Sequence, residues 1–361
     1  MHRLTRGLLM LLLASTALGS VGCRRLFRRR YASTYTPTYT AYTATVAATP
    51  TAIATIGGTF DAGSPPIDPA KAAAYMLHTT SCDEGHGVAS DCNLLGIDYE
   101  EARGTLRDYV MAGKYYLMAC DGKSPDGCTN LGRLYDRGNG FAEDKVKADG
   151  MFLHACNTGS PRGCYELGLH YLYANGGHTQ DNANAVAYFS KACTGTGSKS
   201  GVGDAYACTS LGYMYMRGLG VKKDLARMMT LYRQGCTQGD PAGCVHVGVQ
   251  YEKGEGVAQD DTQAVTYYLR ACNSAAMGGC VNLGLLYEKG RTAAGVKDPA
   301  TAATYYDMAC NKSDPSGCYN LGRLTQFGIG VMVDLPQAKA LYKKACDKGD
   351  GDGCQALARV P

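Results

Sequence analysis

Several kinds of chemistry are excluded by what this 361-residue sequence lacks. It contains no Cys-x2-Cys pair and no Cys-x-x-Cys-His, so the usual signatures of a zinc ribbon and of covalent haem attachment are missing. It has only seven histidines, and a formal net charge of +4 does not resemble that of a nucleic-acid-binding chain. After residue 23 no stretch is long and apolar enough to span a bilayer. We therefore expect no metal, no cofactor and no nucleic-acid partner.

An internal repeat of about 36 residues fills most of the chain. A cysteine is followed by an apolar residue at +3, glycine at +4 and usually tyrosine at +7, as in Cys244, Val247, Gly248 and Tyr251. A glycine-containing turn leads to a second segment with small and aromatic residues, which ends at another cysteine. Both segments have the spacing of one helix face. The sequence therefore predicts an all-α solenoid of about seven helix-turn-helix repeats, each buried only against its neighbours.

The small and turn residues fit this register. Glycine inside a helix costs about 1 kcal/mol relative to alanine, so its recurrence at +4 predicts close approach of the partner helix, with aromatic rings beside it. Glycines after the first helix and aspartates before the second are expected to cap them: Gly138, Gly218, Gly254 and Gly328, and Asp224, Asp298 and Asp334.

Two places depart from the repeat. The first unit has a shortened turn at residues 103–105, which predicts a layer that packs differently. A Gly/Ser-rich insertion at residues 194–207, between units three and four, predicts either a mobile loop or a local break in the stack.

Sixteen of the 17 cysteines form eight local pairs that join the end of one helix to the start of the next. Zinc is a weak alternative, because no histidine recurs in register with them. Closing a loop of about nine residues stabilises the fold by roughly 2.5 kcal/mol, and so many cysteines indicate an oxidising compartment. The expected disulfides are Cys82–Cys92, Cys120–Cys128, Cys156–Cys164, Cys193–Cys208, Cys236–Cys244, Cys272–Cys280, Cys310–Cys318 and Cys346–Cys354.

The N-terminal region predicts export. Residues 1–23 combine a short basic start, an apolar run and Ser20-Val21-Gly22-Cys23, which resembles a bacterial lipobox with Cys23 as the lipidated residue. An ordinary cleaved signal or an uncleaved anchor are the alternatives. Residues 24–67, first Arg-rich and then Thr/Tyr/Ala-rich, are expected to be a disordered tether. The repeat array then occupies residues 68–361.

These residues resemble a known family. Cys-x7-Cys-x2-Leu-Gly-x2-Tyr, then Gly-x-Gly-Val, then Ala-x2-Tyr-Tyr-x2-Ala-Cys is similar to the Sel1-like repeat, a relative of the tetratricopeptide repeat, and its disulfide-linked form resembles the Helicobacter cysteine-rich proteins. The resemblance implies a right-handed α/α superhelix whose concave face is lined by the opening helices. It also implies protein or peptide binding, or binding and slow hydrolysis of penicillin-like β-lactams.

The enzyme interpretation lacks the expected motifs. Ser-x-x-Lys, Lys-Thr-Gly and His-x-His-x-Asp are all absent from the sequence. The histidines are scattered, and His78, His154, His170 and His246 are interpreted as packed or solvated residues.

The binding interpretation rests on positions +2 and +5 of the opening helices, which the superhelix would turn towards its concave face. Asparagine there is suited to a peptide backbone and arginine to carboxylates. The candidate binding residues are Asn130, Arg133, Asn282, Asn320 and Arg323. We thus expect an exported, membrane-tethered scaffold that binds a protein or peptide of the cell envelope; the alternative is a β-lactamase-like hydrolase.

Overall fold

The computed structural model describes residues 68–83 and 88–360. The signal, Cys23 and the tether expected before residue 68 lie outside these residues. The described part contains sixteen α-helices and no strand, which confirms the all-α prediction: α2 Pro69–Asp83, α3 Ala89–Glu101, α4 Tyr109–Asp121, α5 Pro125–Arg137, α6 Lys145–Thr158, α7 Pro161–Tyr173, α8 Asn182–Thr194, α9 Ala205–Arg217, α10 Leu225–Thr237, α11 Pro241–Lys253, α12 Asp261–Asn273, α13 Met277–Lys289, α14 Pro299–Asn311, α15 Pro315–Phe327, α16 Leu335–Asp347 and α17 Gly351–Arg359.

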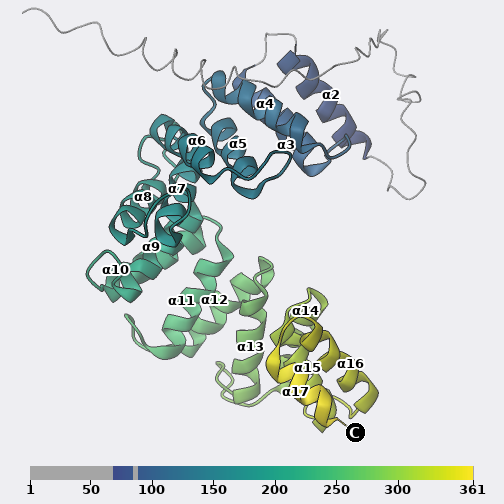
Figure 1. Cartoon of the computed structure of the whole chain (residues 1–361). Helices are drawn as coiled ribbons and strands as arrows, with labels where there is room; N and C mark the ends of the chain where they lie inside the picture. Colours follow the sequence, from purple (N-terminus) through teal and green to yellow (C-terminus); the bar gives the residue numbers. More distant parts are fainter. Residues whose placement is uncertain (1–67, 84–87, 361) are drawn as a thin grey trace, which may run out of the picture. The chain divides into compact units, whose positions relative to one another are not determined.

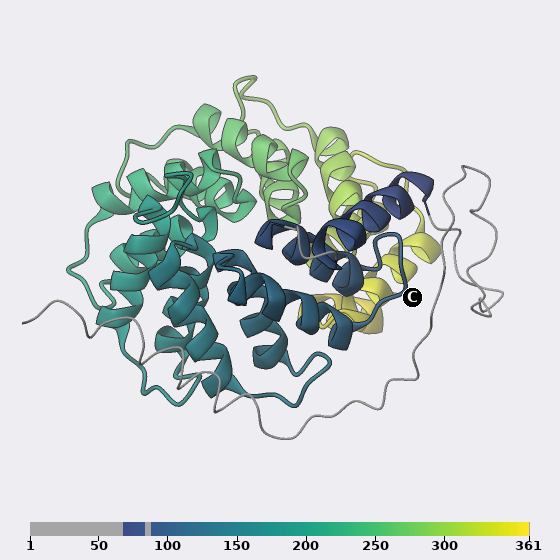
Figure 2. The ribbon, with the colours of Figure 1, turned by 90° about the horizontal axis from the view of Figure 1, so that it is seen from above.

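The helices pair as opening and closing helices of seven units (Figure 1). Each odd-numbered helix from α3 to α15 opens a unit and packs on the even-numbered helix that closes it. Each closing helix then packs on the opening helix of the next unit, so the pairs follow one another in chain order (Figure 2). Helix α2 is a closing helix before the first unit, and α17 is an opening helix after the seventh. This nearest-neighbour stacking defines a solenoid.

The glycine at +4 lets the two helices of a unit touch, as predicted. A Cβ built on Gly248 would lie 2.5 Å from the ring of Tyr268, a side chain that is completely buried. The same clash with a closing-helix ring, at 2.5 to 2.9 Å, would arise at the other six glycines of this column: Gly96, Gly132, Gly168, Gly212, Gly284 and Gly322. No side chain fits there without moving the ring or the helix.

The Gly-x-Gly turns serve two contacts. The first glycine is a left-handed helix C-cap, as at Gly254 with φ 74°, and the aspartates predicted as N-caps accept backbone N–H bonds. The second glycine meets the start of the preceding closing helix. A Cβ on Gly256 would lie 2.8 Å from Leu225 O, and one on Gly330 would lie 2.5 Å from Ala300 N.

Tyrosines link the helices of a unit in two further columns. The tyrosine at +7 stacks on a closing-helix tyrosine, as Tyr251 does on Tyr267 at 5.8 Å between ring centroids. The buried tyrosine facing the glycine donates its hydroxyl proton to a side chain at +8 of the opening helix. These bonds measure 2.5 to 3.1 Å: Tyr116–Glu100, Tyr268–Glu252, Tyr306–Glu288 and Tyr342–Gln326.

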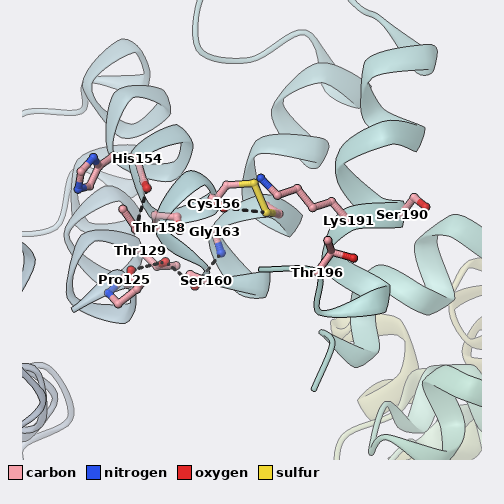
Figure 3. The surroundings of a disulfide bond; sticks show 12 residues. Pro125, Thr129, His154, Cys156, Thr158, Ser160, Gly163, Ser190, Lys191 and Thr196 are labelled. Atoms are coloured by element: carbon pink, nitrogen blue, oxygen red, sulfur yellow. Dashed lines mark hydrogen bonds between the residues drawn. A yellow bond between two sulfur atoms is a disulfide. The ribbon is translucent and has the colours of Figure 1, made fainter. Parts of the chain in front are cut away.

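Eight disulfides join consecutive units in the predicted pairing, from Cys82–Cys92 to Cys346–Cys354. Figure 3 shows the surroundings of Cys156, which is bonded to Cys164. Ser160, the N-cap of α7, accepts from Gly163 N at 3.2 Å, and Thr129 of α5 donates to the Ser160 hydroxyl at 3.0 Å. Hydrogen bonds between neighbouring units thus surround the covalent link.

One recurring contact between units has no obvious sequence signal. Each closing helix has a cysteine in its last turn. In three units, a long polar side chain two positions before that cysteine donates to the backbone carbonyl of the corresponding cysteine in the preceding closing helix. Gln234 reaches Cys193 O at 3.2 Å, Arg270 reaches Cys236 O at 3.1 Å and Lys344 reaches Cys310 O at 2.7 Å. A positive group is favourable there because helix C-termini carry partial negative charge.

The two predicted irregularities are accommodated within the stack. Helix α8 packs on α9, and the Cys193–Cys208 disulfide joins them, so the prediction of a local break at the insertion is wrong. Residues 195–204 form a loop between the two helices. The prediction that the first unit packs differently is also wrong, because α3 packs on α4 as in the other units. Its turn residue Gly104, with φ 76°, lies against Lys71 O at the start of α2.

None of the helices in the described ranges is long and apolar enough to cross a membrane.

Candidate binding face

The opening helices of successive units contact one another along the whole stack. Each odd-numbered helix touches the next, from α3 and α5 through α15 and α17, whereas successive closing helices of the described part make weaker contacts or none. The units therefore approach most closely on the opening-helix side. We call the +2 and +5 residues on this side the opening-helix face: Asn130, Arg133, Glu166, Leu169, Ser210, Tyr213, His246, Val249, Asn282, Leu285, Asn320 and Arg323.

The three predicted asparagines are all half-buried. Asn130 donates to Asn93 Oδ1 of the preceding opening helix at 2.9 Å. Asn320 donates to Ser316 O, one turn earlier in its own helix, at 2.9 Å. Asn282 lies at the same register on α13. The structure thus brings Asn130 and Asn320 into contacts within the array, and a peptide would share or displace those bonds.

The two predicted arginines face acidic side chains of neighbouring opening helices. Arg323 Nη2 donates to both carboxylate oxygens of Glu288, at 2.6 and 2.8 Å. Arg133 Nε lies 4.0 Å from Glu166 Oε1, and this nitrogen is buried without a hydrogen-bond partner. Part of the positive charge expected for carboxylate binding is therefore already compensated, more at Arg323 than at Arg133.

A tyrosine–arginine cluster on α7 and α9 was only partly foreseen from the sequence, because register placed Ser210 and Tyr213 on the face but not Arg162, Tyr165 or Tyr206. Arg162, Tyr165 and Tyr206 contact one another, and Ser210 and Tyr213 continue the cluster along the same face of α9. The Arg162 guanidinium carbon lies 4.9 Å from the ring centre of Tyr165 and 5.0 Å from that of Tyr206. Tyr206 is 46% exposed and Tyr213 is 39% exposed. The sequence spacing could have indicated it, because Tyr206 and Tyr213 are seven residues apart and so lie on one face of α9.

Acidic groups fix the position of Arg162. Its Nε donates to Glu166 Oε1 at 2.9 Å, and Nη1 lies 3.5 Å from Asp204 Oδ2. Burial raises the pKa of Tyr165, and the neighbouring Ser210 and Arg162 partly offset this rise. The cluster is thus pre-arranged on two rigid helices, with two exposed rings on its surface.

The histidines take structural positions. His170 is buried, with Nδ1 2.5 Å from Asp149 Oδ1 and Nε2 3.2 Å from Asp136 Oδ1. Burial alone lowers the pKa of His170, but the bond and charge of Asp149 and the charge of Asp136 outweigh it and raise the pKa. His246 is stacked on the Tyr232 ring, and burial lowers its pKa. Neither arrangement pairs a histidine with a nucleophile.

One group of side chains in the described ranges converges as metal ligands would: Cys120, Cys128 and His154. The two sulfurs are bonded to each other, so they offer no thiolates to a metal ion. Nothing in the part of the chain that the structure describes adds support for the β-lactamase alternative.

The fold and this face define a class of protein, a helical-repeat scaffold with an extended side-chain surface. The Sel1 repeat profile matches seven stretches of the sequence, one for each unit, and the second of them ends inside α6: residues 89–124, 125–148, 161–195, 205–240, 241–275, 279–314 and 315–350. The chain belongs to the Sel1-repeat family.

Solved structures agree with this assignment. A protective antigen of uropathogenic Escherichia coli with a Sel1-like repeat fold is 30% identical, with a TM-score of 0.59, over 79% of this chain and 59% of the antigen. The chain therefore spans less than two thirds of that relative. A Sel1 repeat protein from Oxalobacter formigenes, 24% identical over 80% of this chain and 87% of its own, has a TM-score of 0.62 and shows the same fold.

The Helicobacter pylori cysteine-rich protein B is 32% identical, with a TM-score of 0.32, over 38% of this chain and 97% of its own. Among curated proteins, none matches the sequence.

Proposed function

We propose that this protein is an exported, membrane-tethered scaffold that binds a protein or peptide through its opening-helix face. The observation that carries the proposal is the tyrosine–arginine cluster on α7 and α9. Tyrosine and arginine dominate the binding energy of protein interfaces, because rigid aromatic rings bury a large area at a low cost in conformational entropy. Tyr206 and Tyr213 offer such rings on α9, which the Cys193–Cys208 disulfide joins to α8.

Export is supported by the eight disulfides, which indicate an oxidising environment. Tethering rests on the lipobox-like sequence that ends at Cys23. Replacement Cys23→Ser is expected to move the protein from the membrane fraction to the soluble fraction of the envelope. Retention of the variant in the membrane would contradict the lipid anchor and leave the binding proposal untouched.

Peptide selection tests the binding surface. Residues 65–361 form one compact unit that contains every core cluster and all eight disulfides, so this array is a suitable bait. Peptides selected from a displayed library are expected to lose at least about tenfold in affinity for the Tyr206→Ala/Tyr213→Ala variant.

Tyr173→Ala is the matched control. Tyr173 is 67% exposed at the end of α7 and lies outside the opening-helix face, so its removal should leave affinity unchanged. Asn130→Ala with Asn320→Ala is expected to weaken the same peptides. Equal affinities for all these variants would place the binding surface elsewhere.

A further inference from the structure

The turn of the seventh unit differs from its counterparts at two solvent-facing positions. Four turns share the form Gly-x-Gly-x-x-x-Asp, and their fifth and sixth residues are exposed in every case. Three of them hold polar, charged or small residues there: Ala142-Glu143, Lys222-Lys223 and Ala258-Gln259. The seventh unit has Met332, which is 90% exposed, and Val333, which is 61% exposed. Folding does not require these two side chains, because Ile329 and Val331 of the same turn already pack against the core.

Other exposed apolar side chains lie beside this pair. Phe327, at the end of α15, is 62% exposed, and Val296, in the preceding turn, is 66% exposed. The seventh turn lies against the start of α14, since a Cβ on Gly330 would lie 2.5 Å from Ala300 N, and Val296 comes four residues before Ala300. We call Val296, Phe327, Met332 and Val333 the apolar edge. Exposed apolar side chains gathered at neighbouring turns in this way mark an interaction surface.

Two exposed lysines border this edge. Lys289 and Lys297 flank Val296 and are exposed, with no ion pair among the described residues. Two carboxylates also lie at the edge, and each caps a helix N-terminus, whose partial positive charge offsets part of the negative charge. Asp298 accepts from Thr301 N at 3.0 Å, and Asp334 accepts from Gln337 N at 2.8 Å, as helix N-caps. The edge therefore presents apolar side chains bordered by two unpaired ammonium groups and by two carboxylates that are engaged as helix caps.

We propose that the apolar edge rests on an anionic lipid surface. Apolar side chains at turn tips can enter the region between headgroups and acyl chains, while lysines beside them meet lipid phosphates. The Met332 side chain stands out from the turn and the Val333 side chain is partly exposed beside it, which suits a soft lipid boundary. The inference rests on the proposed membrane location, where an anchor at Cys23, 46 positions before Pro69, would keep the array near the bilayer. It does not require the lipid on Cys23.

A single-tryptophan reporter tests this directly, because the natural sequence has no tryptophan. The array 65–361 with Met332→Trp is mixed with vesicles of phosphatidylglycerol and phosphatidylcholine, and its emission spectrum is followed. A blue shift with anionic vesicles is expected. The matched control is Val146→Trp, since Val146 is 67% exposed on α6, outside the apolar edge, and should show no shift.

A second variant measures how much the two apolar side chains contribute to vesicle affinity, and it leaves the net charge unchanged. Met332→Ala/Val333→Gln copies the exposed pair of the fifth unit, and it is expected to reduce co-sedimentation with the anionic vesicles about tenfold or more. Lys289→Ala/Lys297→Ala should reduce binding several-fold and flatten its salt dependence. Circular dichroism confirms the fold of each variant.

Three outcomes would overturn the proposal: no emission shift in the Met332→Trp variant, undiminished sedimentation of the Met332→Ala/Val333→Gln variant, or a self-association that the latter variant abolishes while vesicles are not bound. These tests use the array without Cys23. Their failure is therefore distinct from failure of the lipid anchor, which the Cys23→Ser fractionation reports.

Discussion

Units five and six differ from units two and three in one central contact. In units five and six a buried tyrosine donates to a glutamate at +8 of the opening helix, in Tyr268–Glu252 and Tyr306–Glu288. Units two and three have phenylalanine in that place, Phe152 and Phe189. Because no tyrosine hydroxyl is present to donate to it, Asp136 at +8 of unit two faces His170 of unit three instead. The comparison shows that the repeat fixes the positions of the helices, while single substitutions redirect polar groups from a contact within a unit to one between units.

The largest effect is expected from breaking the contact between units two and three. His170→Ala would remove the imidazole that Asp149 and Asp136 share in a mostly buried site, and Asp149 would keep only His178, 2.9 Å away. Loss of one member of a buried pair costs about 3–5 kcal/mol, so chemical unfolding should detect a loss of this size. His246→Ala, which removes a stacked but unpaired histidine, is the control. A His170→Ala variant no less stable than His246→Ala would contradict the assigned role.

The helix contact common to all units is expected to give the next largest effect. Gly248→Ala places a methyl group 2.5 Å from the buried Tyr268 ring, and such overpacking costs about 1–3 kcal/mol. Gly150→Ala is the matched control in another helix, since a Cβ there meets nothing within 4 Å. It should stabilise the fold by up to about 1 kcal/mol through helix propensity. Thermal unfolding of the two variants compares them, and equal melting temperatures would refute the close-contact account.

Removing one hydroxyl tests the contact within a unit more gently. Tyr268→Phe converts the fifth unit to the arrangement of the second and deletes the 2.8 Å bond to Glu252. Glu252 keeps its ion pair with Arg291, so the expected loss is only about 1 kcal/mol. Denaturant titration measures it, and Tyr267→Phe, which changes the neighbouring stacked ring, is the comparison. If Tyr268→Phe lowered the free energy of unfolding as much as His170→Ala, the contact within a unit would be as important as the contact between units two and three, contrary to this expectation.

The smallest effect is a pH dependence specific to units two and three. The folded pKa of His170 is raised above its ordinary value of 6.5. Folding then binds a proton more tightly, so this stabilisation is complete below the unfolded pKa and is lost as pH rises through the higher folded pKa. Unfolding free energies measured across this range should decline with pH in the natural protein. The decline should be smaller in His170→Gln, and an unchanged slope would exclude His170 as its source.

Much of the fold was predictable because the repeat makes each position visible seven times. The glycine column, the caps and the disulfide pairing all depend on local spacing, and the structure confirms them. Contacts between units were harder. The donors Gln234, Arg270 and Lys344 differ chemically, and what they share is the carbonyl they reach in the preceding unit.

The candidate site was predictable only as a face. Register placed Asn130 and Arg323 on the opening helices, but their partners Asn93 and Glu288 belong to neighbouring units and depend on how closely the units stack. The tyrosine–arginine cluster breaks the repeat, and a search for recurring residues passes over such positions. In a repeat protein the individual residues carry specificity, so departures from the consensus are the more informative signal.

Site-specific photo-crosslinking of the full-length protein in the cell envelope tests the binding face most directly. Benzoylphenylalanine would replace Tyr213 in the cluster or, as the control, Tyr173 outside the face. The account predicts a discrete crosslinked protein or peptide from position 213 that is absent at position 173 and is lost when Tyr206→Ala is added. Crosslinks equal at both positions, or none at 213, would contradict a binding role for the opening-helix face.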